Sequence, residues 1–230
     1  MDVFLSKGKE LSSGITTYQN LVKSVVRKPG KWNDKLEIEL ESGRKCTLGT
    51  KLKGEVMGEN IAFALAIAEK EGFLDDNGLD LLSSLTMPGR FEIVSVRGKT
   101  VVLDVAHTIN STIAFTKTFS ETFGHGKEKR VLLYPSLENK KHEEMLAILS
   151  KTFDSVIITR AGSFKKSNPD ELGEEAEKYF KSVIIIPSED EAFEKALSIG
   201  DIVAVAGSFY LIGSIGELRH AQLERSPQNT

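Results

Sequence analysis

Two short segments of the chain carry charged side chains beside a predicted strand end or turn. At the end of an apolar run, Asp104 and His107 place a carboxylate and an imidazole three residues apart. Such a pair can accept hydrogen bonds from hydroxyl groups and exchange protons near neutral pH. Arg90 directly follows Pro88 and Gly89, so a rigid turn presents a guanidinium that can pair with a phosphate or a carboxylate.

A third segment, at Gly207 and Ser208, follows the last apolar run and opens a predicted helix. Free backbone N–H groups at a helix start can hold an anion. Each segment also has a purely structural interpretation. Asp104 can cap the helix that follows, His107 can lie in a satisfied turn, Gly207 and Ser208 can form a tight turn with an N-cap, and Arg90 can be a surface charge.

Five short, β-branched and nearly all-apolar runs indicate the sheet that must position these groups. They are Thr100–Val105, Arg130–Tyr134, Asp154–Thr159, Ser182–Ile186 and Asp201–Ala206. Helices are predicted between them at Ser111–Phe123, Lys140–Lys151, Asp170–Phe180 and Glu189–Ser198. Strands and helices in alternation predict an α/β fold with a mostly parallel sheet and helices on both faces. Ligands of such sheets bind beyond the carboxyl ends of the strands.

The first part of the chain has a different pattern, in which a hairpin precedes helices. Apolar and acidic residues alternate over 36–41, and a turn at Ser42-Gly43 leads to a second strand at 45–48. Helices are predicted from Asn60 to about Gly72 and over Asp76–Ser84, with the end of another at Asp2–Lys9. Since Met87-Pro88-Gly89 then breaks the chain, we expect two domains, 1–86 and 87–230.

The composition is that of an ordinary globular protein, with 40% hydrophobic and 27% charged residues in 230. A net charge of -3 gives no reason to expect binding to nucleic acid or a membrane, and we interpret the run at 127–130 as a solvated surface. The single cysteine, Cys46, excludes an internal disulfide and a cysteine-cluster metal site. We expect no metal site built by the chain. We also expect a cytoplasmic location, because no apolar run approaches the roughly 20 residues that span a bilayer.

Taken in order, these motifs resemble the carboxyl-terminal domain of folylpolyglutamate synthase and dihydrofolate synthase, relatives of the Mur ligases. The resemblance is carried by Pro88–Glu92, by Leu103–His107 and by Gly207–Gly213. Residues 54–64 look like the family's Gly-x-His-Asn/Gln-x-x-Asn-Ala segment, and Thr159-Arg160 stands where a Thr-Arg strand end is common. The resemblance implies a Rossmann-like glutamate-ligase domain at 87–230, preceded by a remnant of the Mur-type central domain at 1–86.

The resemblance also implies roles for single residues. Asn60 would contact the adenine, Asp104 would bind the ribose hydroxyls, and Arg90 would reach the nucleotide phosphates. His107 would lie beside the nucleotide and, with Arg90, is the implied catalytic residue, while Ser208 would help to hold glutamate. The implied cofactors are ATP and Mg²⁺. In the implied reaction a carboxylate is phosphorylated and the amine of L-glutamate attacks the acyl phosphate, so cationic groups would stabilise the developing charge.

The chain departs from the family pattern in several places. It contains no Gly-x-x-Gly-Lys-Ser/Thr phosphate loop, which in the family belongs to an amino-terminal domain. Several family residues are also replaced: the histidine and amide of the first motif by Val56 and Met57, the glycine, asparagine and proline after Asp104 by Val105, Thr108 and Ile109, an Asp-Lys-Asp stretch by Asn139-Lys140-Lys141, and a Pro-Arg pair by Phe164-Lys165.

Three functions therefore remain open at the level of the sequence. The first is the carboxyl-terminal part of an ATP-dependent amide-bond ligase that adds glutamate to a folate-type carboxylate and is inactive without an amino-terminal phosphate-loop partner. The second is a catalytically inactive module that binds a nucleotide or glutamate. The third is a regulatory or structural subunit that packs against another ligase domain.

Overall fold

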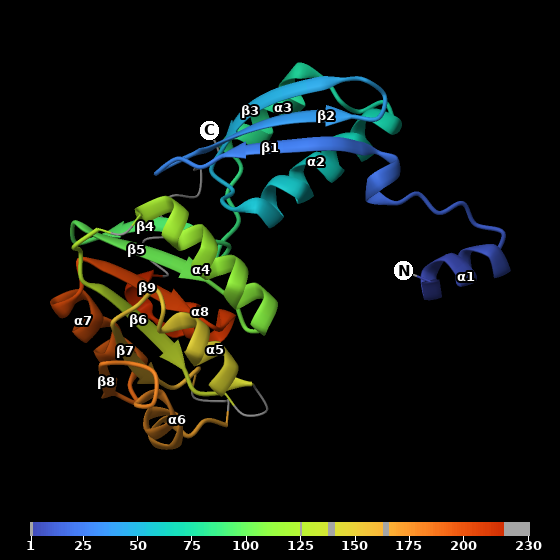
Figure 1. The fold of residues 1–230 in the computed structure, drawn as a ribbon. Helices are drawn as coiled ribbons and strands as arrows, with labels where there is room; N and C mark the ends of the chain where they lie inside the picture. The colour runs from blue at the N-terminus through green and yellow to red at the C-terminus, as the bar shows by residue number, and fades with distance from the viewer. Residues whose placement is uncertain (1, 125, 138–140, 163–165, 219–230) are drawn as a thin grey trace.

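The computed structural model describes residues 2–124, 126–137, 141–162 and 166–218, which form two sheets with their helices (Figure 1). The replaced residues Asn139, Lys140, Phe164 and Lys165 lie outside these ranges. Within the described residues, no helix has the length and apolar character needed to cross a membrane.

The first sheet is a three-stranded antiparallel sheet in the order β1-β2-β3. Its part of the chain contains α1 (Asp2–Glu10), a 3-10 turn (Tyr18–Asn20), β1 (Val22–Lys28), β2 (Asp34–Leu40), β3 (Lys45–Thr50), α2 (Glu55–Lys70) and α3 (Asp76–Ser84). The alternating residues of β2 place Leu36 and Ile38 opposite Leu48 and Cys46 of β3, and these four side chains are buried. The predicted hairpin is therefore confirmed.

Two elements of this part differ from the sequence-based prediction. Helix α2 begins at Glu55, five residues before the predicted start at Asn60, because the glycine at position 54 has a φ of 93° and turns the chain directly into the helix. Strand β1 was not predicted, since Val22 is its only fully buried residue and its pattern carries no regular alternation.

The second sheet has six strands in the order β4-β5-β9-β6-β7-β8. The strands are β4 (Glu92–Val96), β5 (Lys99–Asp104), β6 (Arg130–Pro135), β7 (Ser155–Thr159), β8 (Ser182–Ile185) and β9 (Ile202–Ala206). All neighbouring pairs are parallel except β4 and β5, which form an antiparallel edge. The five predicted strands are confirmed, and β4 is an additional strand.

Helices cover both faces of this sheet, as predicted (Figure 1). They are α4 (Ile109–Phe123), α5 (His142–Leu149), α6 (Pro169–Ala176), α7 (Glu189–Ile199) and α8 (Phe209–Ser214). Helices α4, α5 and α6 pack their buried side chains against one face, where Phe115, Phe119 and Met145 join one core cluster. Helices α7 and α8 complete a separate cluster on the other face, which includes Phe193 and Leu211. The α/β fold with a mostly parallel sheet is thus confirmed.

Candidate functional site

A cavity of about 620 Å³ lies between the two sheets and their helices. One wall is formed by residues 53–57 at the start of α2, the opposite wall by α4, and the remainder by Arg90, Phe91 and Asp104. Apolar side chains, including Val56, make up much of its lining. The cavity can therefore contact a flat apolar group. Its lining also contains charged side chains: Lys53, Glu55, Glu59, Arg90, Asp104 and Lys117.

Asp104 is one of the carboxylates that line this cavity, and it also holds the chain around it in place. At the end of β5 its two carboxylate oxygens accept hydrogen bonds from the N–H groups of Phe91 and Ala106, each at 2.8 Å. Burial disfavours the charged form and raises the pKa of Asp104 to about 6, although the two N–H groups and the nearby Arg90 favour the carboxylate. The carboxylate is therefore both a possible ligand group and a structural anchor.

Arg90 is held in place by the turn that Asp104 anchors. Both residues beside it have positive φ angles, 67° at Gly89 and 46° at Phe91, and the hydrogen bond from the Phe91 N–H to Asp104 holds this unusual backbone. The guanidinium carbon lies 5.4 Å from the ring centroid of Phe209, in cation–π contact. The sequence segment at Pro88–Arg90 therefore does present its cation to the same cavity as Asp104.

His107 lies outside the lining of this cavity and is exposed. Its Nδ1 is 2.8 Å from the carbonyl oxygen of Val105, and since a carbonyl can only accept, Nδ1 carries a hydrogen. The N–H of His107 donates to the hydroxyl of Ser111 at 3.1 Å. The structural interpretation of His107 as part of a satisfied turn therefore describes its contacts, and its catalytic role stays a prediction.

The structure also shows which residue caps α4. The hydroxyl of Thr108 accepts from the N–H of Ser111, and the hydroxyl of Ser111 accepts from the N–H of Thr108, a reciprocal capping arrangement. The suggestion that Asp104 caps this helix is therefore wrong, because its two oxygens are used by Phe91 and Ala106. Thr108, which replaces an asparagine of the family motif, has a capping function in this chain.

Ser208 and Asn60 do not line the cavity either. Ser208 is buried, and its hydroxyl accepts the N–H of Tyr210 at 3.0 Å as the N-cap of α8. Gly207 has a φ of 109°, and a Cβ at this position would lie 2.8 Å from Pro135, so the turn requires glycine. Asn60 is exposed on α2. Of the five predicted site residues, the structure brings only Arg90 and Asp104 together in this cavity.

A family model described as Mur ligase, glutamate ligase domain, matches residues 89–209, more than half of the chain. The chain belongs to this family. The match includes both Arg90 and Asp104, together with all of the six-stranded sheet described above.

Solved structures with this Mur ligase fold resemble the whole described part of the chain. The folylpolyglutamate synthase of Thermotoga maritima is 25% identical with a TM-score of 0.79, and the comparison covers 96% of this chain and 52% of that one. The folylpolyglutamate synthase of Mycobacterium tuberculosis, solved in complex with ADP and AMPPCP, is 21% identical with a TM-score of 0.80, covering 99% and 53%.

A curated relative is a ligase with a different substrate in its name. The UDP-N-acetylmuramoyl-L-alanyl-D-glutamate–2,6-diaminopimelate ligase of Aquifex aeolicus is 26% identical over 175 residues, which are 72% of this chain and 35% of that protein. The Mur ligase chain described here thus spans about half the length of the synthases and about a third of this ligase.

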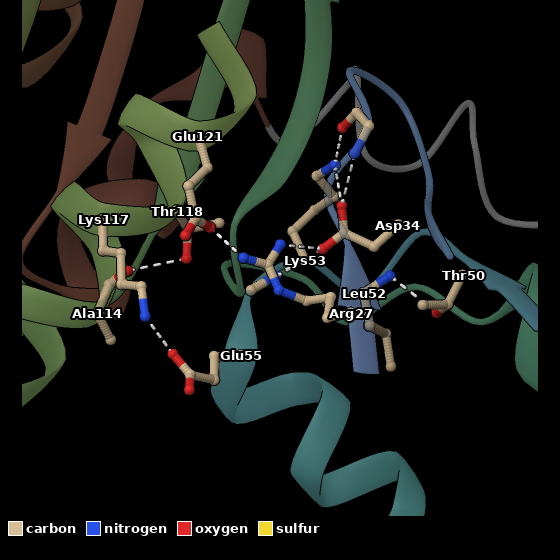
Figure 2. A network of polar contacts seen from close by, with 12 residues as sticks. Arg27, Asp34, Thr50, Leu52, Lys53, Glu55, Ala114, Lys117, Thr118 and Glu121 are labelled. Atoms are coloured by element: carbon tan, nitrogen blue, oxygen red, sulfur yellow. Dashed lines mark hydrogen bonds and ion pairs between the residues drawn. The ribbon is translucent and has the colours of Figure 1, made fainter. Parts of the chain in front are cut away.

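A buried ionic group that was not predicted from the sequence lies outside the segment that matches the family, next to the cavity. Asp34 has a fully buried side chain and accepts hydrogen bonds from Arg27 at 2.7 Å, from Lys53 at 2.6 Å and from the N–H of Gly54 at 3.1 Å (Figure 2). Burial alone would raise the pKa of Asp34, but the hydrogen bonds from Lys53, Arg27 and Gly54 outweigh it and hold the pKa below its usual range.

The ionic group of Arg27, Asp34 and Lys53 holds part of the cavity wall in place. Lys53 and Gly54 line the cavity, and Asp34 fixes the side chain of the first and the backbone of the second. Asp34 follows a turn in the sequence, at Gly30–Asn33, where a polar residue normally indicates an exposed loop. One signal in the sequence did indicate that Asp34 is buried. It stands at the first position of the alternating strand β2, on the same face as the buried apolar residues.

Proposed function

We propose that this chain is the carboxyl-terminal part of an ATP-dependent amide-bond ligase that adds L-glutamate to a folate-type carboxylate and that acts with an amino-terminal phosphate-loop half. In this proposal residues 1–86 are a remnant of the central domain, and 87–230 are the glutamate-ligase domain. The observation that carries it is that Arg90 and Asp104, both inside the segment that matches the family, line one cavity together with apolar side chains.

The cavity suits a nucleotide. An adenine can pack against the apolar side chains at the start of α2 and on α4, such as Val56 and Ile113. Asp104 can accept hydrogen bonds from the ribose hydroxyls, and Arg90 can pair with phosphate oxygens. The mycobacterial synthase, which has a similar fold, was solved in complex with ADP and AMPPCP, and this supports a nucleotide as the ligand. Asn60 remains the predicted adenine contact and Ser208 the predicted glutamate contact.

In the proposed reaction a bound nucleotide supplies the phosphoryl group that activates a carboxylate. The contribution of this chain is to bind and orient: Asp104 holds the sugar, and the guanidinium of Arg90 stabilises negative charge that develops on phosphoryl oxygens. His107 is the predicted second catalytic residue. Its Nδ1 donates to the Val105 carbonyl, which leaves Nε2 as the ring nitrogen that can accept a proton.

The described part of the chain offers no cluster of ligands for Mg²⁺. Among the residues that the structure describes, no three His, Cys, Asp or Glu side chains are grouped so that they could hold a metal ion. Glu55, a carboxylate of the cavity wall, forms an ion pair with Lys117. Any Mg²⁺ in the proposed reaction would therefore need its ligands from the nucleotide and from the partner half.

Calorimetry with the chain alone tests the binding part of this proposal. We expect ADP and ATP to bind and Arg90→Met to weaken ATP more than adenosine, because the substitution removes a phosphate contact and leaves the apolar wall intact. Ser214→Ala, which removes a hydroxyl of α8 that does not line the cavity, is the matched control. Equal weakening of ATP and adenosine by Arg90→Met would contradict the phosphate role.

A second measurement tests the ligase. The chain is mixed with a separately expressed amino-terminal half of a folylpolyglutamate synthase, and ADP release is followed with glutamate and folates present. Release that depends on both halves and on glutamate is the expected result. No release with any folate, in a mixture that does bind ATP, would favour the second candidate, a catalytically inactive nucleotide-binding module. The replacement of a family histidine by apolar Val56 in the cavity wall is the observation that keeps this candidate open.

A further inference from the structure

We infer that two ion pairs of opposite polarity hold α4 against the three-stranded sheet and its helix α2, and that they thereby set the width of the cavity. In one pair α4 carries the negative charge, and in the other it carries the positive charge. In the first pair, Arg27 of β1 contacts Glu121 of α4; in the second, Lys117 of α4 contacts Glu55 of α2 (Figure 2). These four residues, which we call the clamp, position the cavity walls. The inference rests on the proposed function only where nucleotide binding is used as a readout.

Because the two ion pairs have opposite polarity, the clamp favours one position of α4 over positions shifted along the helix axis. Lys117 and Glu121 are four residues apart on α4, so they lie one above the other on the same face of the helix. Their charges are opposite, and each meets its complement on the other side of the contact. A shift of α4 by one turn would bring like charges together, Lys117 toward Arg27 or Glu121 toward Glu55, and would cost energy.

The buried ionic group makes the first pair the stronger one. Arg27, Lys53 and Asp34 together carry one surplus positive charge, and the side chain of Arg27 is only 11% exposed. Glu121 on α4 supplies the missing negative charge. By contrast, Glu55 and Lys117 are 60% and 53% exposed, and pairs of that kind contribute little in water. The first pair therefore provides most of the coupling, while the second mainly fixes the register.

Next to the two ion pairs, the backbone at Gly54 lies close to α4. Gly54 packs against Thr118 so tightly that a Cβ at position 54 would be 2.5 Å from the Thr118 hydroxyl oxygen. Gly54, Glu55, Lys117 and Thr118 all line the cavity, so the contact surfaces are also its walls. The clamp is also bordered by a second hollow of about 420 Å³, through which salt ions can reach it.

The test measures the distance between the two sheets in the full chain, without any ligand. Spin labels are placed at the strongly exposed Lys45 of the first sheet and Lys181 beside β8, in a Cys46→Ala background, and pulsed electron paramagnetic resonance gives the distance distribution. We expect a single narrow distribution in the parent chain, a broader or longer one in Glu121→Gln, and broadening of the parent as salt rises to about 1 M.

Two further variants separate the clamp from general changes in charge. Glu194→Gln removes a carboxylate of the Arg97 ion pair, which lies wholly within the six-stranded part, and should leave the distance unchanged. Glu55→Lys or Lys117→Glu alone should broaden the distribution, and the double charge reversal should restore it. An unchanged distribution in Glu121→Gln, or a double reversal no better than the single changes, would overturn the clamp.

Nucleotide affinity then connects the clamp to the cavity. Glu121→Gln, which lines no part of the cavity, should weaken ADP about tenfold, whereas Lys117→Met should weaken it about twofold or less. If neither parent nor variant binds ADP, the proposed nucleotide function fails while the distance measurement still decides the clamp. If Glu121→Gln widens the distance distribution but leaves ADP affinity unchanged, the clamp does not set the cavity width.

Discussion

At the scale of single residues, Asp104 combines two tasks that the sequence could not separate. Its position after an apolar run predicted a polar group at a strand end, and the structure places it there. Nothing in the sequence pattern indicated that both oxygens would be used by backbone N–H groups. The bond from Ala106 is local to the strand end, and the bond from Phe91 comes from a turn in which Phe91 has a positive φ. A satisfied turn at His107 was one of the interpretations that the sequence allowed, but its partner was not predicted, since the ring bonds to the backbone of Val105.

The raised pKa of Asp104 leads to a prediction about pH. Folding raises this pKa from 3.8 to about 6, so the protonated carboxyl group is more stable in the folded chain than in the unfolded chain, relative to the carboxylate. The resulting stabilisation is present below about pH 4, is lost as the pH rises through 6, and is on the order of 3 kcal/mol. Carbon-13 NMR of the aspartate carboxyl groups, with Asp104→Asn as the assignment control, should show one aspartate with a midpoint near 6. A midpoint near 4 for Asp104 would contradict it.

At the scale of elements, the sheet that carries the site was predictable and its edges were not. The parallel strands are apolar on both faces, and few arrangements besides a sheet covered by helices produce that pattern. Strand β4 escaped prediction because it follows a Pro-Gly turn and has only two fully buried residues, Val94 and Val96. The early start of α2 depended on the φ of Gly54, which a sequence pattern does not reveal.

The reciprocal cap of α4 gives a prediction for an element. Thr108→Ala removes the hydroxyl that accepts the Ser111 N–H and should lower the free energy of unfolding by about 1 kcal/mol in urea denaturation. Thr108→Ser keeps the hydroxyl and should lose much less. Since Thr108 also lines the cavity, a nucleotide titration of both variants shows whether the helix start moves. Equal stabilities of the two variants would argue against the capping role.

At the scale of the whole molecule, each sheet has its own hydrophobic core. The core of the first sheet is made by β1, β2, β3 and α2, whereas two separate clusters flank the six-stranded sheet. Helix α1 lies apart from both sheets, with Val3 79% and Phe4 72% exposed (Figure 1). Exposed apolar side chains are a feature that the third hypothesis, packing against another ligase domain, also predicts.

Separate cores predict two thermal transitions in calorimetry. Asp34→Ala leaves Lys53 and Arg27 without their carboxylate and should destabilise the first sheet by roughly 3 to 5 kcal/mol, shifting only one transition. Phe193→Ala removes a fully buried ring from the other core and should shift only the second transition by a similar amount. If both variants shift one common transition, the two sheets unfold as a single unit.

The missing side chain at Gly54 has a consequence that involves no charge. A single methyl group there would act as a wedge between the sheets, since Thr118 leaves no space for a carbon atom and the positive φ adds backbone strain. Gly54→Ala should therefore move α4 away from the first sheet although every salt-bridge partner is still present. Thr118→Gly in the same chain should relieve the steric part of that effect.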